Sequence, residues 1–154
     1  MNVVDIATAR KTASSTDYVT FTVGGQHFGL TAIDVRDVLK TQALTRVPMA
    51  QHEIAGLINL RGHIVTAVDL RRRFGLVDRT SEERPMSIVI EHKGEQFCLL
   101  ADSVGDVLAL SSNDVEANPT SMDDSWRSVS KGVVRRDEGL MILLDINTTM
   151  TLAA

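Results

Sequence analysis

The sequence has little cysteine, few aromatic residues and no long apolar run. Cys98 is the only cysteine among 154 residues, which excludes an internal disulfide and is typical of a reducing compartment. Aromatic residues make up 4% of the chain, so a stacking surface for single-stranded bases would have few rings to use. A run of about 18 apolar residues and a signal-type N-terminal segment are both absent. We therefore expect a cytoplasmic protein that is not inserted directly into a membrane.

Positive charge is not in excess either. The formal net charge of -4 gives no electrostatic reason to expect nucleic acid or an anionic membrane as the partner. A small-barrel nucleic-acid-binding protein therefore stays an alternative that both the charge and the few aromatic residues disfavour. The chain is 44% hydrophobic, which is enough to bury a core and fits one ordinary domain or two very small ones.

Residues with metal-binding or catalytic chemistry do not cluster in the sequence. The histidines are scattered over different predicted strands and loops without paired spacing, at His27, His52, His63 and His92. A metal site is therefore not expected. A Gly-rich phosphate loop and a Ser/His/Asp signature are also absent. We expect no enzyme activity, no cofactor and no metal.

Three features could suggest catalysis or ligand binding, and each also has a purely structural interpretation. Asp69 and Asp145 precede short polar segments and are predicted to be N-caps of brief helices. Cys98 lies between apolar neighbours and is predicted to be a small core residue. The arginines at 71–73 are interpreted as a solvated helix face. A cryptic enzyme that uses Asp69 or Cys98 stays an alternative, which would need a cleft with perturbed titrating groups.

Short segments with strand periodicity dominate the chain. Residues 18–23 alternate Val19, Phe21 and Val23 with more polar neighbours, which is typical of a β-strand. Further strands are expected at 26–30, 35–40, 56–60, 64–69, 86–92, 95–101, 104–110, 129–135 and 140–145. The predicted class is mostly β with short helices.

The sequence contains an internal repeat. A shift of 69 places lays residues 25–39 over 94–108 with eight identical positions, and a shift of 76 aligns Gly56 with Gly132 and Asp69 with Asp145. We therefore expect a leader at 1–17 and one domain at 18–150. The domain would consist of two subdomains, at 18–76 and 86–150. Units of about 60 residues bury little surface alone, so the two should pack together and leave a groove.

One hairpin raises a question of function. In "GLINLRGHIV" two apolar runs flank a turn that carries Arg61, and the second copy has "RRDEG" at the equivalent place. Arg61 is either a solvated turn residue or a guanidinium held against a partner at the mouth of the groove. The adjacent Leu60 has no use in a purely solvated tip, so both interpretations stay open.

The chain resembles the CheW family of bacterial chemotaxis coupling proteins. The resemblance covers nearly all of residues 18–150, and the spacing between "GLINLRG" and "VDLR" is highly specific. It is carried by "YVTFTVGGQHFGL", "VRDVL", "LTRVP", "EIAGLINLRGHIVTAVDLRRRFGL", "DSVGDVL" and "GLMILLDI". The resemblance implies two SH3-like five-stranded β-barrel subdomains with a groove between them, and no catalysis.

The resemblance also implies partners. Family members bridge the cytoplasmic tip of a chemoreceptor, a methyl-accepting chemotaxis protein, to the regulatory domain of the histidine kinase CheA, and they are recruited to receptor arrays. Receptor-binding positions carried over from the family are Val35, Asp37, Gly56, Arg61, Gly62, Met86 and Val107. The kinase-binding surface is expected near Leu44 and Val47. The family commonly has Glu where this chain has Asp37. A CheW-like module of another signalling system is the nearest alternative.

Overall fold

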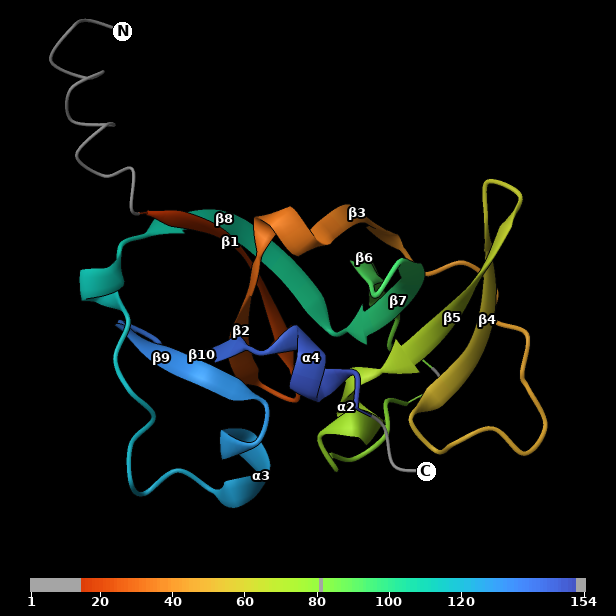
Figure 1. The fold of residues 1–154 in the computed structure, drawn as a ribbon. Helices are drawn as coiled ribbons and strands as arrows, with labels where there is room; N and C mark the ends of the chain where they lie inside the picture. The colour runs from red at the N-terminus through yellow and green to blue at the C-terminus, as the bar shows by residue number, and fades with distance from the viewer. Residues whose placement is uncertain (1–14, 81, 152–154) are drawn as a thin grey trace, which may run out of the picture.

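The computed structural model describes residues 15–80 and 82–151, which form two five-stranded sheets (Figure 1). The β1 sheet has the order β8-β1-β2-β10-β9, with β1 (Thr16–Val23), β2 (Gln26–Thr31), β8 (Ser103–Leu110), β9 (Ser130–Arg136) and β10 (Gly139–Leu144). The β3 sheet has the order β3-β6-β7-β5-β4, with β3 (Val35–Lys40), β4 (Ile54–Leu60), β5 (His63–Asp69), β6 (Met86–His92) and β7 (Glu95–Ala101). The helical pieces are short: η1 (Ala32–Asp34), α2 (Leu70–Arg73), η2 (Ser112–Asp114), α3 (Asp124–Arg127) and α4 (Ile146–Thr149).

The local predictions are confirmed. Each expected strand is present, and its ends lie within two residues of the predicted ones. The Oδ1 atom of Asp69 accepts a hydrogen bond from the N–H of Arg71 at 3.0 Å, and that of Asp145 accepts one from Thr148 at 3.3 Å. Both aspartates are therefore N-caps. Of the expected leader, residues 1–14 lie outside the described residues, and Asp17 is already part of β1.

The two sheets do not follow the two copies of the repeat. The first copy supplies β1 to β5 and the second supplies β6 to β10, yet each sheet combines the first hairpin of one copy with the last three strands of the other. Four strand pairs join the copies: the parallel pairs β2 with β10 and β7 with β5, and the antiparallel pairs β1 with β8 and β3 with β6. Without them, both edges of each hairpin would be left without a partner strand. The boundaries at 76 and 86 therefore separate the copies in the sequence, but each folded sheet draws on both.

One apolar core joins the sheets. Its buried residues come from both, for example Phe21 and Phe28 from the β1 sheet and Ile88 and Leu99 from the β3 sheet. The ring of Phe28 stacks on that of Phe21 at 5.4 Å between centroids and on that of Phe74 at 5.1 Å. Because this core is continuous across the junction, the sheets stabilise each other. Among the described helices, none is long and apolar enough to cross a membrane.

Candidate functional site

The hairpin between β4 and β5 has a two-residue turn. Leu60 is opposite His63, and the turn residues Arg61 and Gly62 have φ values of +50° and +88°. Two positive φ angles are typical of the type I′ turn that fits the twist of a hairpin. The side-chain oxygen of Asn59 accepts a hydrogen bond from the N–H of Gly62 at 2.9 Å. The predicted turn is therefore present, and it holds an arginine in a left-handed conformation that non-glycine residues seldom adopt.

Arg61 is paired with the other charged candidate. Its Nη2 atom lies 3.3 Å from Oδ2 of Asp37, although the guanidinium side chain is 88% exposed and that of Asp37 is 40% exposed. Asp37 is on β3 and Arg61 follows β4, which are the two edge strands of the β3 sheet, so the sheet must curl to bring them together. Most donors of Arg61 still face solvent and can contact a partner.

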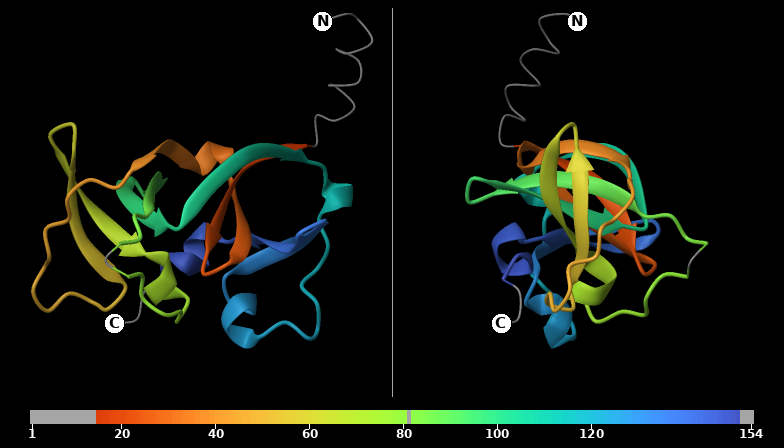
Figure 2. Two further views of the ribbon diagram at one scale, coloured as in Figure 1. Left: turned by 180° about the vertical axis from the view of Figure 1, so that it is seen from behind. Right: turned by 90° about the vertical axis from the view of Figure 1, so that its right-hand side faces the viewer.

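The tip belongs to an outer part of the fold. Figures 1 and 2 show the β4–β5 hairpin projecting from the end of the molecule that is remote from β9 and β10. The strand before the tip, β4, is the outermost strand of its sheet, which the sequence repeat does not show. Contact between Arg61 and a partner stays a prediction.

The apolar candidates lie on three different strands. Val35 packs partly against the common core, and Met86 starts β6, the neighbour of β3. Val107 is exposed on β8, the edge strand of the β1 sheet. Figure 1 shows β3 and β8 along the same upper side of the molecule. Ile33, just before β3, is also apolar and is 80% exposed. Sequence reasoning missed Ile33. The repeat aligns it with a charged residue, Asp102, and this is the signal that could have marked the position as one outside the core.

The two candidate glycines have backbone roles. Gly56 has a φ of +151°, and a Cβ atom there would lie 2.5 Å from the carbonyl oxygen of Thr45. This close approach lets Thr45 form a β-bridge with Leu57, with N···O distances of 2.9 and 2.8 Å. Gly62 completes the turn and has open space around it. Both glycines therefore shape the candidate surface through the backbone.

The candidate kinase-binding residues lie on the connection between β3 and β4. Leu44 and Val47 are each more than one third exposed, and the side chain of Met49 nearby is fully exposed. A hollow of about 410 Å³ adjoins Val47 and Met49 and is bounded by Arg72. Exposed apolar side chains gathered on one loop are typical of a protein-binding surface. Sequence reasoning missed Met49, which follows a proline and carries no periodic signal.

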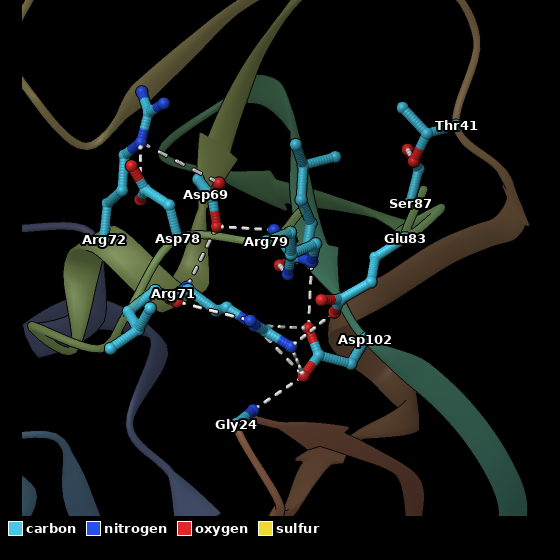
Figure 3. A network of polar contacts seen from close by, with 12 residues as sticks. Gly24, Thr41, Asp69, Arg71, Arg72, Asp78, Arg79, Glu83, Ser87 and Asp102 are labelled. Atoms are coloured by element: carbon cyan, nitrogen blue, oxygen red, sulfur yellow. Dashed lines mark hydrogen bonds and ion pairs between the residues drawn. The ribbon is translucent and has the colours of Figure 1, made fainter. Parts of the chain in front are cut away.

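A polar cluster that is buried except at Glu83 joins the two sheets, and sequence reasoning did not find it (Figure 3). We call it the polar clasp; it consists of Asp69, Arg71, Arg79, Glu83 and Asp102. The Nε atoms of Arg71 and Arg79 each lie 2.9 Å from Oδ1 of Asp102, and Nη1 of Arg79 lies 2.8 Å from Oδ1 of Asp69. Oδ2 of Asp102 also accepts a hydrogen bond from the N–H of Gly24 at 2.7 Å. The clasp thus ties the β1–β2 turn to α2 and to the linker between the copies.

The interpretation of residues 71–73 as a solvated helix face is wrong. The side chain of Arg71 is only 15% exposed because carboxylates of the clasp pair with it. Arg73 donates hydrogen bonds to the carbonyls of Thr148 and Thr149 at 2.8 and 2.7 Å, next to the last turn of α4. Arg79, from a segment that reads as a linker, is 8% exposed. These charges are buried because tertiary partners compensate them.

The titratable groups also fit a structural role. Burial would raise the pKa of Asp102, but hydrogen bonds from Arg71 and from the N–H of Gly24, together with the charges of Arg79 and Arg71, hold it below its ordinary value. Cys98 is buried as predicted, and this burial raises the pKa of its thiol to about 11. A thiol of this kind is a poor nucleophile at neutral pH. Within residues 15–80 and 82–151, no three His, Cys, Asp or Glu side chains gather into a possible metal site.

The chain is similar to known proteins in both sequence and structure. A family model described as a CheW-like domain matches residues 17–154. The chemotaxis protein CheW of Rhizobium meliloti is 30% identical over 132 residues, which cover 86% of this chain and 85% of the relative. That of Thermotoga maritima is also 30% identical over 132 residues, which cover 85% of each chain. The crystal structure of the scaffolding protein TtCheW from Thermoanaerobacter tengcongensis matches with a TM-score of 0.77 at 28% identity, covering 90% of this chain and 94% of that one.

Proposed function

The chain belongs to the CheW family, and from this membership we propose that it couples the cytoplasmic tips of chemoreceptors to the histidine kinase CheA. The family is one of non-catalytic scaffold proteins of chemotaxis, so the chain acts as an adaptor, and its two five-stranded sheets fit the SH3-like subdomains of that fold. The family match over residues 17–154 carries the proposal. In this role the protein is cytoplasmic and is recruited to receptor arrays by its partners.

The proposed receptor-binding surface combines charge with exposed apolar side chains. Arg61 and Asp37 form an exposed ion pair that contributes little to stability by itself, so its charges are available to a partner. Val107 supplies exposed apolar area and Val35 and Met86 are partly exposed, while Gly56 and Gly62 shape the backbone. A protein helix with mixed apolar and charged residues fits such a surface.

The proposed kinase-binding surface lies on a different segment from the Asp37–Arg61 ion pair, and the two proposed surfaces meet where Gly56 approaches Thr45. Leu44, Val47 and Met49 form an exposed apolar patch on the β3–β4 connection. The regulatory domain of CheA would cover this patch and remove its apolar area from water. Two different surfaces on one chain are what an adaptor needs, because both partners must bind at once.

Charge reversal of Arg61 tests the receptor-binding surface. Arg61→Glu places a second carboxylate beside Asp37 and opposes any partner that recognises the guanidinium. We expect receptor binding to weaken by about 2 kcal/mol or more, as for an interfacial charge, while CheA binding is unchanged. The measurement is co-sedimentation with receptor-containing membranes, together with receptor-dependent CheA phosphorylation.

Arg135→Glu is the matched control for this test. Arg135 is also exposed and paired, with its Nε atom 3.1 Å from Glu116, but it lies on β9 of the other sheet. We expect this variant to bind both partners as the parent does. Equal receptor binding by Arg61→Glu and the parent would show that Arg61 is only a turn residue. Mixtures of receptor and kinase that are as active without the protein would contradict the proposed function itself.

A further inference from the structure

Because of the internal repeat, the sheets meet at two equivalent places, which we call junctions: one at Asp69 and one at Asp145. At the first junction Arg71 and Arg79 pair with the aspartates. At the first junction the clasp holds Asp69, Arg71 and Asp102 around the turn at Gly24. The repeat shifts of 69 and 76 place Asp145, Asn147, Ile33 and Lys93 at the equivalent positions of the second junction. The second junction therefore keeps the aspartate, but Asn147 stands at the position equivalent to Arg71 and Ile33 at the position equivalent to Asp102.

The two aspartates are held in the same way. The backbone N–H of Asp69 donates to the carbonyl of Glu53 at 2.8 Å, and that of Asp145 donates to the carbonyl of Val129 at 2.7 Å. Each carboxylate also caps the short helix that follows it. Asp69 additionally binds the guanidinium of Arg79, whereas in the described part of the chain no lysine or arginine nitrogen lies within 4 Å of the Asp145 carboxylate.

A hollow lies at the second junction, beside Asp145 and Asn147. It has a volume of about 510 Å³, within the range of roughly 300–1,000 Å³ that is common for ligand pockets, and its acidic lining residues are Asp34, Glu91 and Asp145. Glu91 is already near Arg36, with an N···O distance of 3.8 Å. His92, Lys93 and Lys131 also line the hollow, and the ammonium of Lys131 lies 5.7 Å from the centre of the Tyr18 ring. In this hollow the Asp145 carboxylate is held by its hydrogen bond from the N–H of Thr148, and no lysine or arginine among the described residues pairs with it.

We propose that this hollow binds the guanidinium of an arginine side chain from the chemoreceptor tip. Arginine is favoured because a guanidinium occupies the equivalent site at Asp69, and its planar donors can serve two carboxylates at once. Asp34 and Asp145 both line the hollow; Oδ2 of Asp34 accepts a hydrogen bond from the Thr31 hydroxyl, which leaves its Oδ1 and the Asp145 carboxylate as the two acceptors. The receptor is favoured because Asp34 directly precedes Val35, at the start of the strand that carries the proposed receptor surface. The assignment to the receptor rests on the proposed function.

The first test uses a small probe and the full chain. N-acetyl-arginine amide is titrated in an NMR experiment, with the N-acetyl-citrulline amide as a neutral probe of the same shape. We expect saturable shifts of the backbone amides around Asp145 and Asn147 with the arginine probe only. Asp145→Asn should abolish them, because asparagine keeps the helix cap but removes the charge. Shifts that persist in this variant, or that citrulline also causes, would overturn the proposal.

The second test measures capture of a receptor cytoplasmic fragment. Loss of one charged hydrogen-bonded contact weakens binding by about 10- to 100-fold, so we expect Asp145→Asn to bind the receptor that much more weakly and CheA as before. Asp123→Asn is the matched control, since Asp123 precedes α3 without forming a side-chain cap. If the parent binds receptor and Asp145→Asn binds it equally, this inference alone fails. If the parent does not bind receptor, the proposed function fails with it.

Discussion

Arg79 is predicted to hold the two sheets together, although it lies in the linker between the copies of the repeat. Arg79→Met removes the guanidinium and keeps an unbranched side chain. Three contacts are lost: Nε to Asp102 at 2.9 Å, Nη1 to Asp69 at 2.8 Å and Nη2 to the carbonyl of Leu100 at 3.0 Å. We expect this single substitution to destabilise the whole fold.

The expected loss of unfolding free energy depends on the ion pairs that Asp102 and Asp69 keep in the variant. Removing one partner of a buried ion pair costs about 3–5 kcal/mol, because the other charge stays buried. Here Arg71 still pairs with Asp102 at 2.8 Å, whereas Asp69 keeps only Arg72 at 4.0 Å. The loss should therefore be about 2–4 kcal/mol of unfolding free energy. With an m-value of about 2 kcal/mol per molar urea, the urea midpoint should fall by about 1–2 M.

The assay is urea unfolding followed by circular dichroism, with Arg72→Met as the matched control. Arg72 is in the same helix but is 25% exposed, and its nearer partner Asp78 is 58% exposed at 3.3 Å. An exposed pair of this kind contributes about 0–1 kcal/mol, so the control should shift the midpoint little. Equal midpoints for the two variants, or a loss below about 1 kcal/mol for Arg79→Met, would refute the role of the clasp.

Three further predictions concern the same architecture. Because the folded pKa of Asp102 is lowered, its contribution to stability is fully present above the unfolded pKa of about 3.9 and is lost as the pH falls through the folded value. The unfolding free energies of the parent and of Asp102→Asn should begin to converge below about pH 4 and should differ least below the folded pKa. Fragments 18–76 and 86–150 should each be mostly unfolded, because every sheet needs strands from both, and calorimetry of the whole chain should show one transition instead of two. Gly56→Ala should cost about 3 kcal/mol, since its Cβ would lie 2.5 Å from the Thr45 carbonyl oxygen, whereas Gly62→Ala, with open space around it, should cost about 1 kcal/mol in thermal unfolding.

The strands and the helix caps could be predicted from the sequence because they depend on neighbouring residues. Alternation of apolar and polar side chains indicates a strand wherever one face is buried. An aspartate before a short helix caps it through its own side chain, as Asp69 and Asp145 do. The hairpin turn at Arg61 was predictable for the same reason, since Leu60 and His63 on either side are only three positions apart.

Part of the candidate site could also be predicted. The resemblance to the CheW family selected Asp37 and Arg61 although they are 24 positions apart, and the structure brings their side chains to 3.3 Å. It also selected Leu44 and Val47, which lie on an exposed loop. Whether these residues bind the partners stays a prediction. The repeat did not show that β4, the strand before the Arg61 turn, is the outermost strand of its sheet.

The sequence by itself determined the mostly β class, the repeat, the caps and the family. Only the tertiary structure decided which strands became neighbours and which charges became buried. Alternation shows that a strand has a buried face but not which strand pairs with it, so the exchange of β1–β2 and β6–β7 between the copies was invisible. In the same way, the sequence suggests that the charge of Arg79 is solvated, because its partner Asp102 is 23 positions away and only the folded structure brings the two together. A buried charge is stable only when folding supplies its partners, and those partners are distant in the chain.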